Sequence, residues 1–480
     1  MNCCVKKGKN TRVGVKGVRV TKAREWETRN KFRCLFCGGS KCNHEDWTKH
    51  PSPAIQGLNS DWITESILAT QRLSSRLIEE FQVLEKFKEQ GINAVFNLQL
   101  PGEHPYCGDG LRQGNSFTYL PDEIFAAGMY FYNFGWRDMH APTIDHMVNI
   151  VHLMSFVLDN GGKLAVHCHA GYGRTGLAIA AYLLFSSNLT VPQVVDLVRS
   201  KRSRCIQTKT QCQFLEQFHK YLLRIRVVFP EKPLAVQEFL ANQSVLVHGN
   251  DSKVISGLPK LLHTVCSIVK ERFNEGHYTK ETIGYSFVDP EHPHFSSPLY
   301  QSYIGNLREA NTSIDETCTV SQSPGFPLLE KKLEVLKHKL NSWDWQSLKE
   351  EKDARVLVQL MLDWLENAIA KPLISEPRTI EKFFELVSDG SSVSYSYEIK
   401  GSVKKHQFRT LEIIAEHIVK PLKGFTEEPG ALVRLVIALT GAQETQNLNE
   451  RKLVKAKPED LSEPNKFLVE ILTKWAETFD

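Results

Sequence analysis

A cysteine and an arginine separated by five residues are the most informative feature of this chain. Cys168 and Arg174 stand in the segment VHCHAGYGRTG, whose three glycines let the backbone curl so that successive N–H groups point inward. The start of a following helix adds further N–H donors and the positive end of its dipole. Such a loop fits a phosphate dianion. Besides Arg174, the residues that we expect to bind it are His169, Ala170, Gly171, Tyr172 and Gly173.

The side chains of this loop predict covalent phosphoryl transfer. A helix N-terminus and a neighbouring cation stabilise a thiolate, so we expect Cys168 to act as a nucleophile without a separate base. Arg174 carries a planar fork that binds two phosphoryl oxygens and follows them into the transition state, which a lysine cannot match. Thr175 can donate a proton to the thiolate when it leaves. Each residue alone would more often be structural, but together they indicate catalysis.

The neighbouring segments place this loop in a strand–loop–helix turn. Residues 163–167 form a short apolar strand, and the apolar run 177–185 has helical spacing. Alternating elements around this turn predict an α/β fold with the active site beyond the carboxyl ends of central strands. The other predicted elements are helices over 74–90 and 143–158, strands over 93–98 and 129–136, and a helix after the capping box Thr190–Gln193.

The loop resembles the signature loop of the cysteine-dependent protein tyrosine phosphatases, Cys-x5-Arg-Thr. The upstream stretches ILATQR and VFNLQLPGEHPYCG extend the resemblance over residues 58–226, near the dual-specificity branch. It implies a cysteine-phosphatase fold, with a central mixed sheet flanked by helices. It also implies a protein phosphatase that forms a phosphocysteine intermediate without a cofactor or metal. A cytoplasmic location and a link to cilium formation are further implications.

A two-step displacement needs a general acid, because an alkoxide or phenolate leaves poorly without a proton. Asp138 is the candidate, in a loop between an aromatic strand and a helix, thirty residues before Cys168. This loop resembles the mobile acid loop of the family, with Arg137 where the classical enzymes have proline. A turn or helix-cap aspartate is the competing interpretation. The nucleophile loop favours catalysis.

Gln207 lies in a segment that resembles the family's glutamine loop, whose glutamine positions the water that hydrolyses the phosphocysteine. Gln211 could serve the same purpose. Thr208 and Gln211 also have the spacing of a capping box for the helix that follows. Gln207 is therefore the preferred catalytic residue.

Two absences bear on the substrate. No copy of the tyrosine-bearing motif that builds a deep phosphotyrosine pocket is evident, so phosphoserine and phosphothreonine stay open beside phosphotyrosine. Inositol-lipid phosphatases of the superfamily place lysines in the loop, where this chain has His169 and Tyr172. A lipid substrate is disfavoured, although partial charge on His169 would recover some attraction. A function in messenger-RNA capping is even less favoured, since no guanylyltransferase lysine motif is evident.

A scaffold that binds phosphorylated partners without turnover is the alternative from another functional class. All core catalytic positions are present, which favours an enzyme acting on phosphorylated proteins.

Composition predicts a multi-domain protein of a reducing compartment. The 480 residues are 41% hydrophobic, and the eleven dispersed cysteines follow no secretory leader. The longest apolar run, 177–185, is nine residues and too short to cross a bilayer. Residues 1–33 hold eleven Lys or Arg against two Glu, so this arm carries +9 and the remainder −5 of the net +4. Such an arm favours contact with acidic surfaces.

The predicted N-terminal segment, residues 1–57, also contains thiols with metal-ligand spacing. Cys34, Cys37, Cys42 and His44 are enough for one tetrahedral zinc, although the last spacing is shorter than in common zinc modules. A glycine-containing loop with incidental thiols is the competing interpretation, and the phosphatase chemistry does not depend on a metal.

Residues 227–480 predict a helical accessory region with a long loop at about 275–327, which is rich in Pro, Ser and His. Two apolar stripes at helical spacing should face a core. They are Leu357, Leu360, Met361, Trp364, Leu365 and Ala368, and Phe467, Leu468, Ile471, Leu472 and Trp475. No nucleophile or phosphate loop stands out, so we expect this region to bind a protein partner or to shape substrate access.

Overall fold

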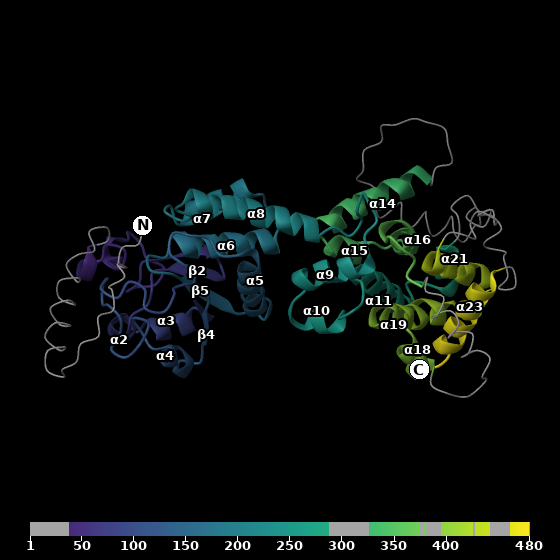
Figure 1. Cartoon of the computed structure of the whole chain (residues 1–480), viewed down its shortest axis with the longest axis horizontal. Coiled ribbons are helices and arrows are strands. Elements are labelled where there is room, and N and C mark those ends of the chain that lie inside the picture. Colours follow the sequence, from purple (N-terminus) through teal and green to yellow (C-terminus); the bar gives the residue numbers. More distant parts are fainter. Residues whose placement is uncertain are drawn as a thin grey trace, which may run out of the picture. The chain divides into compact units, whose positions relative to one another are not determined.

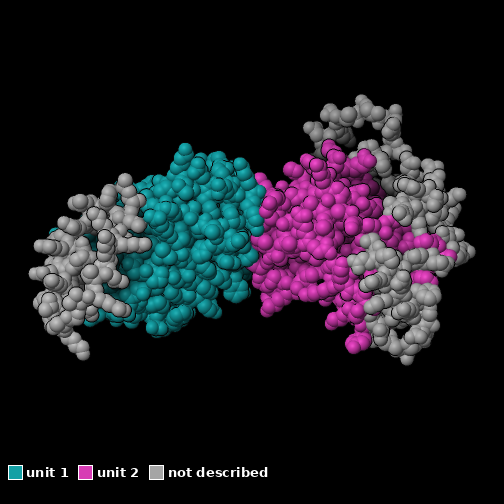
Figure 2. All heavy atoms as spheres, viewed as in Figure 1, with its two compact units in different colours: residues 1–222 teal, residues 223–480 magenta. Residues whose placement is uncertain are grey.

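The computed structural model describes residues 38–287, 326–374, 379, 395–425, 428–441 and 461–479. The chain divides into two compact units, Met1–Leu222 and Leu223–Asp480 (Figure 2). The first unit is α/β and the second is helical in the described residues (Figure 1). None of the helices in these ranges is both long and apolar enough to span a membrane.

A five-stranded mixed sheet forms the centre of the first unit, in the order β1-β2-β5-β3-β4. β1 pairs antiparallel with β2, and every other pair is parallel. β5 is central, and four of its five residues are buried. This is the mixed sheet that the family resemblance implies. The strands are β1 (Ser60–Thr64), β2 (Ile67–Thr70), β3 (Ile92–Asn97), β4 (Tyr130–Asn133) and β5 (Lys163–His167).

Helices flank this sheet. α6 packs against α5, α7, β2 and β5, and nearly all of its side chains are buried, as its continuous apolar run predicts. Thr143 caps α5 by accepting the N–H of His146 at 3.2 Å, and Gln193 caps the start of α7. The helices are α2 (Ser75–Phe81), α3 (Val83–Glu89), α4 (Pro121–Ala126), α5 (Ile144–Asp159), α6 (Gly173–Ser186), α7 (Val191–Lys201) and α8 (Lys209–Ile225).

Three features of the first unit differ from the sequence prediction. The helix predicted over 74–90 is broken at Gln82, whose φ of +51° separates α2 from α3 and lets each helix bury its own apolar side chains. The aromatic strand is shorter than predicted. β1 and β2 were not predicted, because the four residues of β2 are all buried and show no alternation. α4 was not predicted either.

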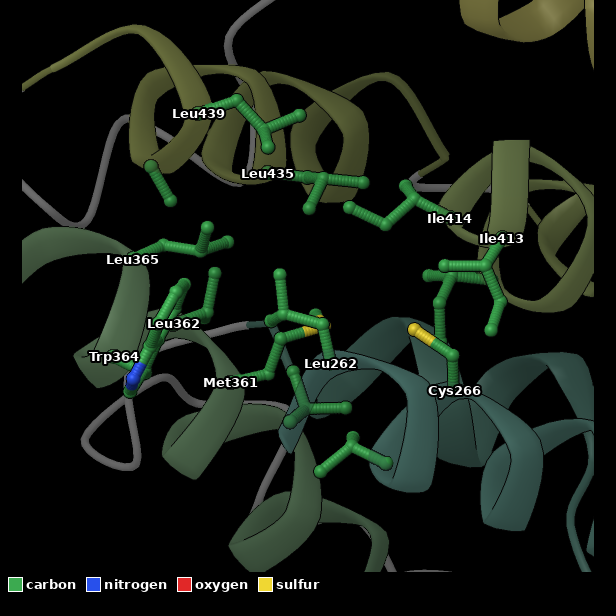
Figure 3. Close-up of a cluster of buried hydrophobic side chains, with 14 of the residues drawn as sticks. Leu262, Cys266, Met361, Leu362, Trp364, Leu365, Ile413, Ile414, Leu435 and Leu439 are labelled. Carbon is green, nitrogen blue, oxygen red and sulfur yellow. The ribbon is translucent and has the colours of Figure 1, made fainter. Parts of the chain in front are cut away.

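The second unit is built of helices around one apolar core. Figure 3 shows side chains of α11, α16, α19 and α21 pointing toward one another, with Leu262, Met361 and Leu435 among them. The helices and helical turns are α9 (Val236–Leu246), α10 (Gly249–Val254), α11 (Lys260–Asn274), α12 (Lys280–Tyr285), α14 (Phe326–Asn341), α15 (Gln346–Glu350), α16 (Ala354–Asp363), η4 (Trp364–Ala368), α18 (Tyr395–Ser402), α19 (Lys405–Ile414), η5 (Ala415–Val419), α20 (Lys420–Leu422), α21 (Glu428–Thr440) and α23 (Glu463–Ala476).

Both predicted stripes face this core. The six side chains of the first stripe are buried, and so are four of the five in the second, Phe467 being half-buried. Part of the predicted loop 275–327 is helix α12, because the Thr279 hydroxyl accepts the N–H of Thr282 at 3.2 Å and Ile283 is buried. Residues 288–325 of that loop lie outside the described residues, as does the basic arm 1–33.

Replacing Leu262 with alanine tests the core of the helical unit. Leu262 is 0% exposed, so the cavity should lower the free energy of unfolding by about 2–5 kcal/mol. Val335→Ala is the control, since Val335 is 48% exposed in α14 and its loss should cost less than about 0.5 kcal/mol. Urea denaturation followed by tryptophan fluorescence measures both, and equal effects would contradict the assignment of Leu262 to the core.

Candidate active site

Cys168 lies at the carboxyl end of β5, and α6 begins five residues later at Gly173. Its side chain is 3% exposed. Gly171 has a φ of +71°, and a Cβ atom there would lie 2.2 Å from the carbonyl oxygen of Thr70. Only glycine therefore fits this turn of the loop.

Two buried arginines hold the carbonyl groups on the outside of the loop. The backbone N–H of Arg72 donates to the carbonyl of His169 at 3.0 Å, and Arg202 Nε donates to that of Gly171 at 2.7 Å. Arg202 is itself paired with Asp61 at 2.6 Å. With its carbonyls bonded outward, the loop is shaped to offer N–H groups inward.

Arg174 is fully buried and held along one edge of its guanidinium group. Nη1 donates to the carbonyls of Leu98 at 3.0 Å and Trp136 at 2.8 Å, and to Glu103 Oε2 at 2.7 Å. Nε and Nη2 form no hydrogen bond within the described part of the chain, although Nε lies 3.2 Å from Asp138 Oδ1. The anchored edge fixes the fork and leaves the other edge for an anion.

Asp138 lies beside this edge, as the sequence predicts for an acid. Its Oδ2 is 3.3 Å from His104 Nε2. Burial acts to raise the pKa of Asp138, but the hydrogen bond from His104 and the charge of Arg174 outweigh it and lower the pKa below its usual value. The loop is held in place by Trp136 Nε1, which donates to the carbonyl of His140 at 2.9 Å. In this state Asp138 is a carboxylate paired with Arg174.

Thr175 and the two glutamines approach the helix end of the loop. The Thr175 hydroxyl is buried and has no hydrogen bond among the described residues. A Cβ atom at Gly173 would lie 2.8 Å from Gln207 Oε1 and 3.1 Å from Gln211 Nε2, so both amides face the loop.

Gln211 also forms the capping box predicted for α8. Its backbone N–H donates to the Thr208 hydroxyl at 3.2 Å, and its Oε1 accepts the backbone N–H of Thr208 at 3.3 Å. Its Nε2 is buried without a hydrogen bond among the described residues. Gln207 is exposed. Both glutamine amides therefore lie at the helix end of the loop, next to Gly173.

The two histidines that flank Cys168 are buried. His167 Nδ1 donates to the carbonyl of Cys168 at 3.1 Å, so Nε2 accepts the hydroxyl of Tyr119 at 2.7 Å. His169 Nε2 lies 2.9 Å from Glu45 Oε1. Burial lowers the pKa of His169 to about 3, and the hydrogen bond to Glu45 opposes this only partly. The ring is neutral near pH 7, so the partial charge expected of it is absent.

Tyr172 and Ala170 complete the predicted loop. The Tyr172 ring centroid is 4.3 Å from the guanidinium carbon of Arg202, and its hydroxyl accepts from Asn59 Nδ2 at 3.2 Å. The carbonyl of Ala170 accepts from Arg202 Nη2 at 3.3 Å. Neither Tyr172 nor His169 brings a positive charge to the loop.

Sequence reasoning missed the partners of the loop. Glu103 binds the guanidinium group of Arg174. Burial raises the pKa of Glu103, and the positive charge of Arg174 opposes this only partly. Glu45 pairs with Arg72 Nε at 2.7 Å. The stretch PGEHPYCG contains Glu103 and was noted only as part of a resemblance. The sequence offers one signal for Glu103, which is a carboxylate next to a histidine after a buried strand.

Of the four predicted zinc ligands, Cys34 and Cys37 lie outside the described residues. Cys42 is 3% exposed and its Sγ lies 3.6 Å from His169 Nε2. The ring of His44 is 6.1 Å from that of His169, between centroids.

Comparison with known proteins agrees with this geometry. A family model described as "Polymorphic toxin system, DSP-PTPase phosphatase" matches residues 71–188. Protein tyrosine phosphatase domain-containing protein 1 of Mus musculus is 40% identical over 243 residues, which are 49% of this chain and 32% of that protein. Tyrosine-protein phosphatase CDC14 of Candida albicans is 29% identical over 127 residues, 26% of this chain and 20% of that protein. The chain thus spans about a third or less of these relatives.

Among solved structures, Tk-PTP in its active form matches 34% of this chain and 96% of its own, at 21% identity and a TM-score of 0.28. The structure of kinase associated phosphatase with its catalytic cysteine replaced matches 35% of this chain and 96% of its own, at 22% identity and a TM-score of 0.29.

Gly171→Ala should disrupt the loop, because the new methyl group would meet the Thr70 carbonyl at 2.2 Å and the backbone has a φ of +71°. Gly161→Ala is the matched control, with a φ of +76° but nothing within 4 Å. Gly161→Ala should lower the free energy of unfolding by about 1–2 kcal/mol, which is the cost of a left-handed backbone in a non-glycine residue. Gly171→Ala should lower it by about 1–3 kcal/mol more, because of the added overlap with Thr70. Thermal unfolding and tungstate binding measure the difference. Equal losses would show that the loop does not pack against Thr70.

Proposed function

Because residues 71–188 belong to the cysteine-based protein tyrosine phosphatase superfamily, we propose that the chain hydrolyses phosphotyrosine, and also phosphoserine and phosphothreonine, in proteins through a phosphocysteine intermediate. The observation that carries the proposal is the state of Arg174. Its guanidinium group is buried and anchored through Nη1, while Nε and Nη2 form no hydrogen bond among the described residues. A buried cation with two open donors beside a cysteine is matched by a phosphoryl group.

Substrate binding would change the partner of Arg174. Two phosphoryl oxygens accept from Nε and Nη2, and the other oxygen accepts from the N–H groups of the loop. The dianion takes the place of the Asp138 carboxylate, which lies 3.2 Å from Nε. Once the substrate neutralises Arg174, that charge no longer lowers the pKa of Asp138, and the nearby dianion raises it, while the hydrogen bond from His104 still lowers it. The carboxyl group can then hold the proton that the leaving oxygen needs.

The chemical steps follow from these positions. The Cys168 sulfur attacks phosphorus, the S–P bond forms as the P–O bond to the substrate breaks, and Asp138 gives its proton to the leaving oxygen. In the second step water attacks the phosphocysteine, Asp138 takes a proton from the water, and the sulfur leaves. Thr175 can donate to that sulfur, and Gln207 or Gln211 can orient the water.

The loop environment favours a phosphorylated protein over an inositol lipid. The ring of His169 is neutral and bonded to Glu45, and Tyr172 lies against Arg202. These two variable positions therefore offer no cation to additional phosphates. A cytoplasmic location and a link to cilium formation stay implications of the family resemblance, and a protein partner for residues 227–480 stays a prediction from the sequence.

Cys168→Ser should lower the rate of aryl phosphate hydrolysis at least about 10³-fold, because the nucleophile is lost. Vanadate binding should persist. Cys212→Ser is the control, since this half-buried cysteine lies in α8 and outside the loop. Steady-state kinetics and isothermal titration measure the two properties. Unchanged turnover in Cys168→Ser would remove the activity from this site, and binding without turnover in the unaltered chain would favour the scaffold alternative.

Asp138→Asn should lower kcat about 10²–10⁴-fold for a phosphate ester with a poor leaving group, because the general acid is lost. The loss should be smaller for an activated aryl phosphate, whose leaving group needs less protonation. Asp145→Asn is the control, an exposed carboxylate in the first turn of α5. A loss that does not depend on the leaving group would assign Asp138 a structural role instead.

A further inference from the structure

A histidine that takes no chemical step in the proposed hydrolysis lies against the proposed acid. His104 follows Glu103 in the loop after β3, and 13% of its side chain is exposed. Its Nε2 lies 3.3 Å from Asp138 Oδ2. This contact joins two loops that are far apart in the sequence and that meet beside the phosphate loop, residues 168–174.

The ring of His104 is also held at its other nitrogen and on one face. Nδ1 lies 3.9 Å from Sγ of the buried Cys107. Donation by the thiol to Nδ1 leaves the proton of a neutral ring on Nε2. One face stacks on the ring of His169, with centroids 4.0 Å apart and planes 19° apart. His104 thus presents an N–H to Asp138 from a ring that also contacts the phosphate loop.

The backbone of His104 is held in an uncommon conformation. Its φ is +50°, which costs a non-glycine residue about 1–2 kcal/mol. Its carbonyl accepts from Arg72 Nη1 at 3.3 Å and from the backbone N–H of Cys107 at 3.3 Å. Strain of this kind persists where the surrounding contacts fix it, and it is concentrated at functional sites. The strained backbone is what places the ring against Asp138.

The two oxygens of Asp138 have different neighbours. Oδ1 lies 3.2 Å from Arg174 Nε and accepts the backbone N–H of Met139 at 3.0 Å. Oδ2 is the oxygen that faces His104. Oδ1 is therefore on the side of Arg174, where the phosphoryl group of the proposed mechanism binds.

We propose that His104 is a positioning residue for Asp138. The inference rests on the proposed function, in which a phosphoryl group displaces Asp138 from Arg174. After that displacement, His104 and the N–H of Met139 still hold the carboxyl group. With Oδ2 fixed by His104, Oδ1 stays directed at the leaving oxygen and gives its proton there. In the second step the same oxygen takes a proton from the attacking water.

The hydrogen bond also sets the charge state of the acid. Burial acts to raise the pKa of Asp138, while the hydrogen bond from His104 and the charge of Arg174 lower it. Because a donor to the carboxylate favours the ionised form, loss of the His104 donor raises that pKa. The acid then stays protonated to higher pH. The titratable and charged groups around Asp138 are Arg174 of α6, His169 of the phosphate loop, Glu103 and His104 of the loop after β3, His44 of the N-terminal segment, and His140 of its own loop.

A matched pair of variants tests the hydrogen bond. His104→Met and His104→Gln have side chains of equal length, but only glutamine keeps an N–H donor. His104→Met should lower kcat about 10–100-fold for a phosphate ester with a poor leaving group, and should change KM less than about 2-fold. His104→Gln should recover kcat to within about 3-fold of the unaltered protein. The loss in His104→Met should be smaller for an activated aryl phosphate.

The pH profile of kcat gives a second readout. In His104→Met the basic limb of the profile should move to higher pH, because the pKa of Asp138 rises, and in His104→Gln it should stay near its original place. His277→Met is the control, since His277 pairs with Glu275 at 3.1 Å on an exposed surface of the second unit. It should change neither kcat nor the profile. Tungstate binding checks that the phosphate loop of each variant is intact.

Two results overturn the positioning role. One is equal activity of His104→Met and His104→Gln, whether both are slow or both are fast. The other is a loss in His104→Met that is the same for both leaving groups and leaves the pH profile unmoved, which would show that the ring only fills space. In either case Asp138→Asn would still show its dependence on the leaving group. If Asp138→Asn itself lacks that dependence, the proposed function fails rather than the role of His104 alone.

Discussion

The burial of one guanidinium group constrains the whole first unit. Arg174 is 0% exposed, and a buried cation is costly unless it is paired and hydrogen-bonded. Its partners come from different parts of the chain: the carbonyls of Leu98 and Trp136, and the carboxylates of Glu103 and Asp138. The carboxyl end of β3, the acid loop and the start of α6 must therefore meet at one point. The same contacts leave Nε and Nη2 without a hydrogen bond among the described residues.

The loop that carries Asp138 is tied to the same cation by an ion pair. While Asp138 is paired with Arg174, its pKa stays low and it is ionised. In the proposed mechanism a phosphoryl group competes for that pairing, which would couple substrate binding to protonation of Asp138. Arg72 and Arg202 act differently, because they bond the carbonyls of the loop from outside and pair with Glu45 and Asp61. Arg174 is the arginine that we propose binds the substrate, and the other two hold the shape of the loop.

The helical unit depends on apolar packing. Its core of leucine, isoleucine, valine and tryptophan side chains follows from apolar stripes that are legible in the sequence, as the burial of Leu357, Trp364 and Trp475 illustrates. Trp364 also donates its indole N–H to the carbonyl of Val228 at 3.1 Å, so even its polar atom is bonded. These contacts account for a stable fold.

Sequence alone was sufficient for the strand–loop–helix unit that contains Cys168 and Arg174. The strand Lys163–His167, the loop from Cys168 to Arg174 and the caps at Thr190 and Thr208 depend on neighbouring residues, whose spacing sets backbone hydrogen bonds and helix starts. Only the tertiary structure decided which groups surround that unit. Glu103 meets Arg174 across 71 positions and Cys42 meets His169 across 127. Such pairings cannot be read from periodicity in the sequence, because they depend on how strands and loops pack. Among the groups that packing brings close, a buried charge favours those that can pair with it.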